Sequence, residues 1–217
     1  MVIDLGRFSG NIRHRNGIIT ECTMGWRKPP MLPEQFTSAL ESKSFTNGKS
    51  DKPLVARLYC ELFTDAMRRL DVLDYSNLQW GDAEFVQIAR LIRSGAVPKL
   101  ARIALMYDTK HKVRPQATDI GFGELLDALV EQQPPLETLD LSGHLLTDVS
   151  FERVINVMRA GMLQHLCCLY VTSSKGTLPV LTRLRDTCKR QGDMKGKKFT
   201  FSAMVHDGKG MGGKVNV

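Results

Sequence analysis

The sequence predicts an α/β fold, a short solenoid in which parallel strands line one face and helices line the other. Two observations carry this prediction. Between Leu136 and Met158 the apolar residues first alternate, as in a strand, and then follow helical spacing. The same pattern returns at matching offsets elsewhere in the chain. A strand and helix of this length cannot bury an apolar face alone, so the copies are expected to stack on one another.

The copies begin at residues 70, 100, 136 and 166, and the second carries an insertion at residues 108–118. Each opens with a variant of Leu-x-x-Leu-x-Leu, which sends alternate side chains of a short strand inward. Three copies continue with an aspartate, Asp82, Asp119 or Asp148, and a phenylalanine three residues later. We expect each aspartate to cap the helix that it opens, because a carboxylate there accepts from free N–H groups and faces the positive end of the helix dipole.

The remaining elements flank these copies. A helix is expected from Asp51 through Met67, with Asp51 as its cap and Pro53 in its first turn. Its predicted packing stripe is Leu54, Leu58, Leu62 and Ala66, widened by Val55, Tyr59, Phe63 and Met67. Residues 199–205 alternate like a strand that either closes the edge of this sheet or joins a partner's sheet. The chain thus divides into a basic arm and linker (1–50), a repeat domain with a capping helix (51–191) and a basic, glycine-rich tail (192–217).

The stretch LETLDLSGHLLTD, followed by a helical segment, resembles a leucine-rich repeat. A repeat length near 30 with a helical second half is similar to the ribonuclease-inhibitor-like class, and the resemblance covers about Leu70–Gln191. It implies a curved solenoid with a parallel sheet on the concave face and helices on the convex face, in a protein that binds other proteins. The family's usual turn asparagine is replaced here by Leu78, Asp108, His144 and Ser174, which implies less regular turns, and His144 is expected to bond the turn backbone.

Positive charge is concentrated at the two ends. Residues 1–30 carry five basic and two acidic side chains, residues 31–182 carry 16 and 18, and residues 183–217 carry nine and three. Basic arms are suited to contact nucleic acid or an acidic partner, and they also serve solubility alone. The candidate contact residues are Arg13, Arg15, Lys110, Lys112, Arg114, Lys195, Lys197 and Lys198.

Composition bounds the location of the protein. No apolar run approaches the roughly 18 residues that span a bilayer, and no secretory signal is recognised, so membrane insertion is not expected. Five cysteines without a C-x-x-C pair favour a reducing compartment. We therefore expect an intracellular protein, with the cytoplasm favoured and the mitochondrial matrix as the alternative.

No residue set predicts catalysis, a cofactor, a small-molecule substrate or a metal site. The glycine motif at Gly208–Gly213 is not followed by the helix that a phosphate site needs. Cys167 and Cys168, near His165, are adjacent on an expected strand, so their side chains should point to opposite faces and not share an ion.

The concave face is the expected contact surface. Alternation places on it Val72, Asp74, Ser76, Arg102, Ala104, Met106, Thr138, Asp140, Ser142, Cys168, Tyr170 and Thr172. The candidate partner-binding residues are Asp74, Arg102, Met106, Asp140 and Tyr170, since tyrosine, methionine and arginine are enriched at protein interfaces. The sequence thus favours a non-catalytic scaffold that binds other protein subunits of a larger complex. The alternative is a ribonucleoprotein subunit, ribosome-like, whose basic arms contact RNA.

Overall fold

The computed structural model describes residues 28–45, 48–78, 80–107, 116–205 and 213–216. Within them the helices are α2 (Pro33–Glu41), α3 (Gly48–Arg69), α4 (Asp82–Arg93), α5 (Asp119–Gln132), α6 (Asp148–Arg159) and α7 (Leu178–Met194). The strands are β1 (Val72–Asp74), β2 (Arg102–Ala104), β3 (Thr138–Asp140), β4 (Cys168–Val171), β5 (Thr200–Val205) and β6 (Gly213–Asn216). The predicted α/β class with a parallel sheet is therefore confirmed.

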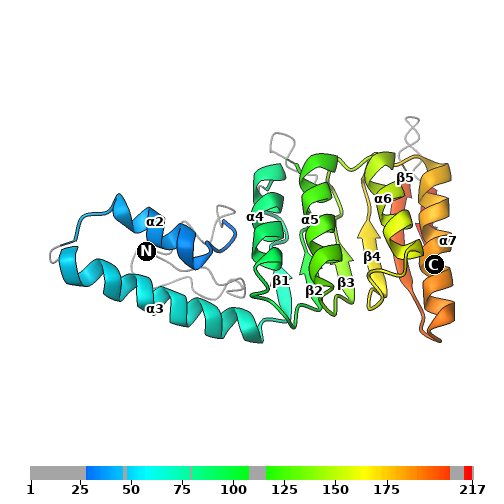
Figure 1. Cartoon of the computed structure of the whole chain (residues 1–217). Coiled ribbons are helices and arrows are strands. Elements are labelled where there is room, and N and C mark those ends of the chain that lie inside the picture. The colour runs from blue at the N-terminus through cyan, green and yellow to red at the C-terminus, as the bar shows by residue number, and fades with distance from the viewer. Residues whose placement is uncertain (1–27, 46–47, 79, 108–115, 206–212, 217) are drawn as a thin grey trace.

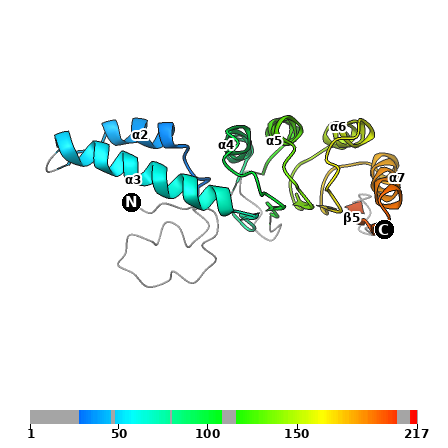
Figure 2. The ribbon, with the colours of Figure 1, turned by 60° about the horizontal axis from the view of Figure 1, so that its bottom comes forward.

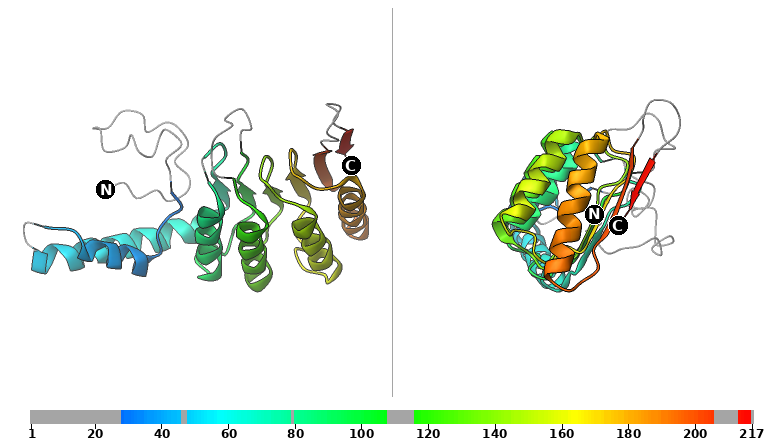
Figure 3. Two further views of the ribbon diagram at one scale, coloured as in Figure 1. Left: turned by 90° about the horizontal axis from the view of Figure 1, so that it is seen from above. Right: turned by 90° about the vertical axis from the view of Figure 1, so that its right-hand side faces the viewer.

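Strand and helix alternate along the chain and form two layers. Strands β1 to β5 are parallel neighbours in chain order, and β6 adds at the end as an antiparallel strand. Helices α4, α5, α6 and α7 stand side by side on one face of this sheet, while α2 and α3 project from the β1 end (Figure 1). Seen end-on, the helical layer and the sheet lie back to back (Figure 3).

The core lies between the two layers. At the start of each copy the first leucine is buried, and so is the middle residue of each strand: Leu70 and Leu73, Leu100 and Ile103, Leu136 and Leu139, Leu166 and Leu169. From the helices, Phe85, Phe122 and Phe151 are each at most 1 % exposed. The alternation read from the sequence thus gives the inward side of the sheet correctly, because a pleated strand shows every second side chain to the same face.

The recurring aspartates do not cap their own helices. The caps are the preceding residues, Gly81, Thr118 and Thr147, and the aspartates occupy the first helical position. Each aspartate instead accepts two hydrogen bonds from the threonine at the cap of the following helix, one from its N–H and one from its hydroxyl. We call these contacts the Asp–Thr joints: Asp82–Thr118 (2.7 and 2.8 Å), Asp119–Thr147 (2.9 and 2.6 Å) and Asp148–Thr177 (2.7 and 2.8 Å).

The Asp–Thr joints tie the N-termini of adjacent helices together. Asp119 also accepts a hydrogen bond from the Ser150 hydroxyl, and Asp82 accepts one from the Gly121 N–H at 3.0 Å. A side chain at Gly121 would place its Cβ 2.6 Å from the Asp82 Cα, so only glycine permits this approach of α5 to α4. Burial raises the pKa of Asp119, but the hydrogen bonds from Ser150 and Thr147 outweigh it and hold the pKa below its usual value.

The strand-to-helix turn of the third copy is closed by His144, as predicted. Its Nδ1 accepts a hydrogen bond from the Ala117 N–H at 3.1 Å, so the proton sits on Nε2, which donates to the Leu105 carbonyl at 2.6 Å. Burial lowers the pKa of His144, against the opposing effect of the Leu105 carbonyl and of the charges on Asp140 and Asp82. The equivalent Ser174 is also buried, but its hydroxyl has no hydrogen-bond partner among the described residues.

The first two helices form a hairpin, and their details differ from the sequence prediction. Helix α3 begins three residues before Asp51, so Pro53 lies inside the helix and Asp51 lies in its first turn. Phe36 of α2 stacks on Tyr59 of α3 with ring centroids 3.7 Å apart, and the Tyr59 hydroxyl donates to the Met31 carbonyl at 2.6 Å. Burial raises the pKa of Tyr59 to about 12.

The predicted packing stripe of α3 is wrong at its three leucines, whereas the row predicted to widen it is packed against the core. Leu54, Leu58 and Leu62 are exposed to 44, 51 and 48 %, and the buried face is the flanking row of Tyr59, Phe63 and Met67. Both rows recur every four residues, so spacing alone could not choose between them. The aromatic row is inside because it meets Phe36 and Leu40 of α2, both of which are buried.

At the C-terminal end the sheet extends into the range predicted as a tail. Helix α7 reaches Met194, and β5 pairs in parallel with β4. The strand predicted at 199–205 therefore joins this chain's own sheet, where β6 pairs with its other edge, and Phe199 and Phe201 enter the core. Among the described helices none has a stretch long and apolar enough to cross a membrane.

Candidate interaction surface

The second face of the sheet carries the residues predicted to bind a partner. No described helix packs on this side, which we call the open face (Figure 3). The strand register lines up its side chains in rows across the sheet. One row is Val72, Arg102, Thr138, Cys168 and Thr200, and the next is Asp74, Ala104, Asp140, Tyr170 and Ser202. Neighbouring members of a row are roughly 5 Å apart, since that is the spacing between paired strands.

The structure leaves all five candidate partner-binding residues accessible. Asp74 and Arg102 are exposed, Met106 is 36 % exposed, and Asp140 and Tyr170 are partly exposed. Two other residues predicted on this face are buried instead, Ala104 at 1 % and Ser142 at 6 % exposure. Ala104 is a methyl group between the larger Asp74 and Asp140, and the Ser142 hydroxyl accepts a hydrogen bond from the Thr172 N–H at 3.3 Å.

The charged groups of the open face differ in how firmly they are held. Asp74 and Asp140 occupy equivalent places and accept from the N–H two residues later, that of Ser76 at 3.1 Å and of Ser142 at 3.0 Å. Arg102 has no hydrogen bond or ion pair within the part of the chain that the structure describes. A guanidinium left free on an open sheet can bond a carboxylate or a backbone carbonyl of a partner.

Tyr170 is the aromatic member of the row formed with Asp74, Ala104, Asp140 and Ser202. Burial raises the pKa of its hydroxyl, and Cys168 and the Asp140 charge act in the same direction, while Arg102 opposes them. In its row of the sheet, Tyr170 pairs with Asp140 of β3 on one side and with Ser202 of β5 on the other. The face therefore combines one aromatic anchor with a cation, an anion and the thioether of Met106 at its edge, the mixture that protein interfaces favour.

The prediction that Cys167 and Cys168 point to opposite faces is wrong. Their Sγ atoms lie 4.0 Å apart, and both side chains are partly exposed. Strand β4 begins only at Cys168, and the amides of both cysteines donate to one acceptor, the Glu137 carbonyl, at 2.9 Å. Two successive amides cannot converge on one oxygen in a regular extended strand, so the alternation rule does not apply to Cys167. Burial and the neighbouring Cys168 raise the pKa of the Cys167 thiol.

Only part of the predicted basic contact set can be placed. Lys195, Lys197 and Lys198 are exposed together in the turn between α7 and β5, with the Lys195 ammonium bonded to the Gln164 carbonyl. The others lie outside the described residues: Arg13, Arg15, Lys110, Lys112 and Arg114.

Two exposed apolar rows were missed by the sequence reasoning. One is Leu54, Leu58 and Leu62 on α3. The other lies at the helix N-termini: Ile120 and Val149 are the second residues of α5 and α6, and Leu178 is the first residue of α7, with exposures of 74, 61 and 53 %. The sequence signal for Ile120 and Val149 was their position directly after Asp119 and Asp148. This position faces away from the core in both helices.

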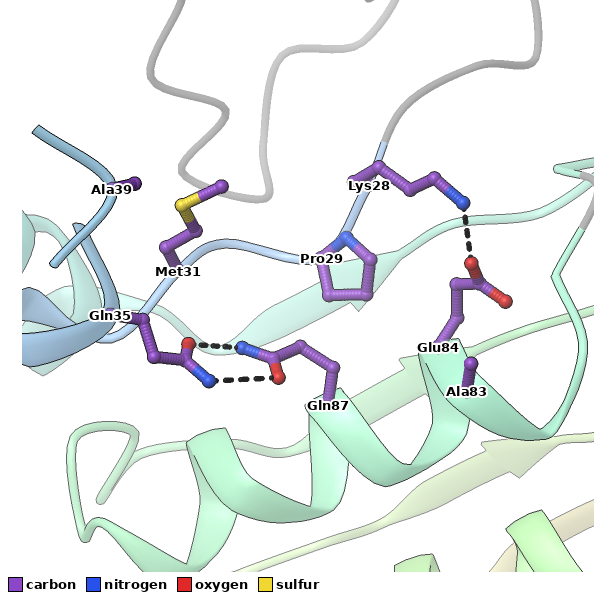
Figure 4. A pocket seen from close by; sticks show the side chains of 8 residues that line it. All are labelled: Lys28, Pro29, Met31, Gln35, Ala39, Ala83, Glu84 and Gln87. Atoms are coloured by element: carbon purple, nitrogen blue, oxygen red, sulfur yellow. Dashed lines mark hydrogen bonds and ion pairs between the residues drawn. The ribbon is translucent and has the colours of Figure 1, made fainter. Parts of the chain in front are cut away.

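A pocket of about 410 Å³ lies where the hairpin meets α4 (Figure 4). Its lining is Lys28, Pro29, Met31, Gln35, Ala39, Ala83, Glu84 and Gln87. Lys28 pairs with Glu84 at 2.5 Å, and the Gln35 and Gln87 amides bond each other in both directions, at 3.2 and 2.5 Å. The polar groups thus satisfy one another, and these contacts join the N-terminal segment and α2 to α4.

The described residues define an α/β protein with a five-stranded parallel sheet that is covered by helices on one side. Comparison with protein-family models and with curated proteins finds no match to this chain.

Proposed function

We propose that this chain is a non-catalytic protein–protein interaction scaffold, a short leucine-rich-repeat arc that serves as a structural subunit of a larger assembly. The observation that carries the proposal is the open face, where Arg102 on β2, Met106 just after β2 and Tyr170 on β4 are accessible, with β3 between the two strands. The repeated strand-helix units and their Asp–Thr joints support the repeat assignment, because the same contact recurs between successive copies.

The arrangement of the acidic residues supports a role without catalysis. The recurrent carboxylates Asp82, Asp119 and Asp148 are each engaged by a threonine of the next copy. His144 is buried and bonded to backbone on both ring nitrogens. Groups held in this way stabilise the stack and are not presented to a substrate.

The test is capture of partners from native extract with the full-length chain, at low and high salt and with and without nuclease. The triple variant Arg102→Ala, Met106→Ala, Tyr170→Ala should lose proteins that the wild type retains through salt and nuclease. A matched control changes three exposed residues of the helix layer, Ile120→Ser, Val149→Ser and Leu178→Ser, and should keep them. An open-face variant that retains every partner would overturn the proposal, and selective loss in the control would assign binding to the helix edge instead.

A second candidate function is a ribonucleoprotein subunit. The specific observation is the exposed group Lys195, Lys197 and Lys198 at the turn between α7 and β5. Phosphate contacts by lysine release counterions, so binding weakens linearly on a log–log plot against salt, with a slope set by the number of phosphates neutralised.

Fluorescence anisotropy with a single-stranded RNA tests this alternative. Changing Lys195, Lys197 and Lys198 to Gln should reduce the magnitude of the slope of log affinity against log salt concentration by about two to three. Changing the exposed Lys99, Lys175 and Lys189 to Gln removes the same charge elsewhere and should change it less. Equal slopes in both variants would show that no localised RNA contact exists at this turn.

A further inference from the structure

The thiols of Cys167 and Cys168 differ from those of the other described cysteines because their sulfur atoms lie close to each other. Cys60 is exposed on α3, and Cys188 is fully buried in α7. Among the described cysteines, only the 167–168 pair brings two sulfurs within contact distance, 4.0 Å, at the N-terminal end of β4. The Cys167 thiol donates to the Glu137 carbonyl at 3.4 Å, which holds its sulfur near that of Cys168.

This pair is poorly suited to form a disulfide. Consecutive Cα atoms across a trans peptide lie about 3.8 Å apart, whereas disulfide-linked cysteines usually have Cα atoms about 4.4–6.8 Å apart. No cis peptide bond occurs in the described chain. A disulfide between neighbours would therefore be strained and easily reduced, and the resting form in a reducing environment is the dithiol.

The same spacing fits two sulfurs bound to one metal ion. With metal–sulfur bonds of about 2.3 Å and a tetrahedral angle, two thiolates on one ion lie about 3.8 Å apart. The sulfurs need to approach by only a few tenths of an ångström from their present 4.0 Å. Both side chains are partly exposed, so a cation reaches them without unfolding the turn.

We propose that Cys167 and Cys168 chelate one soft, thiolate-preferring metal cation. Among the described residues no group of three or more His, Cys, Asp or Glu side chains is arranged to hold a metal. The two sulfurs therefore supply the only protein ligands assigned here, and solvent fills the remaining positions. Thiolates select soft cations over Mg²⁺ and Ca²⁺, which prefer oxygen ligands.

The test is titration of the full chain with Cd²⁺, whose thiolate complexes absorb in the ultraviolet, in a phosphine reductant that contains no thiol. A background of Cys22→Ser and Cys60→Ser leaves the pair and the buried Cys188. This protein should bind one Cd²⁺ per chain, and an excess of Mg²⁺ should not compete. Either Cys167→Ser or Cys168→Ser alone should weaken binding about 100-fold or more, because the second thiolate binds intramolecularly.

The control is Cys188→Ala in the same background, which should leave the affinity for Cd²⁺ unchanged. Circular dichroism of each variant checks that the fold persists, as expected for changes at partly exposed positions. Two results would overturn the proposal. One is equal affinity in the single variants and their parent. The other is a stoichiometry of one Cd²⁺ per two chains with a dimer in size-exclusion chromatography, because the ion would then bridge molecules.

Discussion

The strand-helix stack and the helical hairpin are held together in different ways. In the stack, every helix from α4 to α7 buries one face on the sheet, and the Asp–Thr joints fix each helix N-terminus to the next. The hairpin has one aromatic seam between α2 and α3 and lies beyond α4 at the end of the row of helices (Figure 2). It meets the stack through Lys28–Glu84 and Gln35–Gln87 (Figure 4). The seam buries Tyr59, Phe63 and Met67 and leaves the flanking row of Leu54, Leu58 and Leu62 exposed.

The two parts differ in how their units meet their neighbours. Helices α5 and α6 each take part in an Asp–Thr joint on both sides, so their polar ends are satisfied by the helix before and the helix after. Among the described residues, the hairpin meets the stack on one side only. The predictions below test this comparison, in order of decreasing effect.

The two faces of α3 should differ most. Phe63→Ala removes a ring that is 3 % exposed and should lower the free energy of unfolding by about 3–5 kcal/mol. Leu58→Ala, on the exposed row, should change it by less than about 0.5 kcal/mol. Urea denaturation followed by far-ultraviolet circular dichroism measures both, and similar losses would mean that the leucine row is covered in solution.

Within the stack, the central joint should be the most sensitive polar contact. Asp119→Ala leaves the Thr147 N–H and two hydroxyls without their acceptor, and should cost about 2–3 kcal/mol. Asp65→Ala removes a carboxylate of the hairpin that only pairs with Arg69 at the surface, and should cost less than about 0.5 kcal/mol. Equal effects in urea denaturation would contradict a structural role for the joints.

The stack should also respond to acid through His144. Because burial lowers the pKa of His144 in the folded protein below its usual 6.5, the unfolded chain takes up this proton first as the pH falls. The contribution of His144 is therefore complete above pH 6.5 and declines below it. The free energy of unfolding, measured by denaturation between pH 7.5 and 5, should fall less steeply with pH in His144→Gln than in the wild type. In His165→Gln, a change at an exposed position, the fall should match that of the wild type. An unchanged slope in His144→Gln would exclude the buried imidazole as its source.

The features that could be predicted from the sequence are those that depend on periodicity. Alternation identified Leu73, Ile103, Leu139 and Leu169 as inward residues, and helical spacing with a phenylalanine identified Phe85, Phe122 and Phe151. The open-face residues Arg102 and Tyr170 followed from the same alternation. These signals are local, because each strand or helix carries its own pattern.

The features that were missed depend on contacts between units. Asp119 accepts a hydrogen bond from Thr147 of the next strand–helix unit. An aspartate that caps its own helix and one that bonds the next helix occupy the same place in the sequence, so the sequence could not distinguish the two roles. The buried face of α3 was decided by α2, which the spacing of α3 does not encode. The proximity of the Cys167 and Cys168 thiols follows from a shared acceptor on the neighbouring copy, the Glu137 carbonyl.

The smallest expected effect concerns the imperfect turn of the fourth copy. The Ser174 hydroxyl is buried without a partner among the described residues, so its desolvation is not repaid by a hydrogen bond. Ser174→Ala should therefore stabilise the protein, by up to about 1 kcal/mol. Ser142→Ala, which removes the acceptor of the Thr172 N–H, should have the opposite sign and cost about 0.5–1 kcal/mol. Thermal denaturation of the two variants side by side decides this, because a loss of stability in both would mean that the Ser174 hydroxyl has a partner in solution.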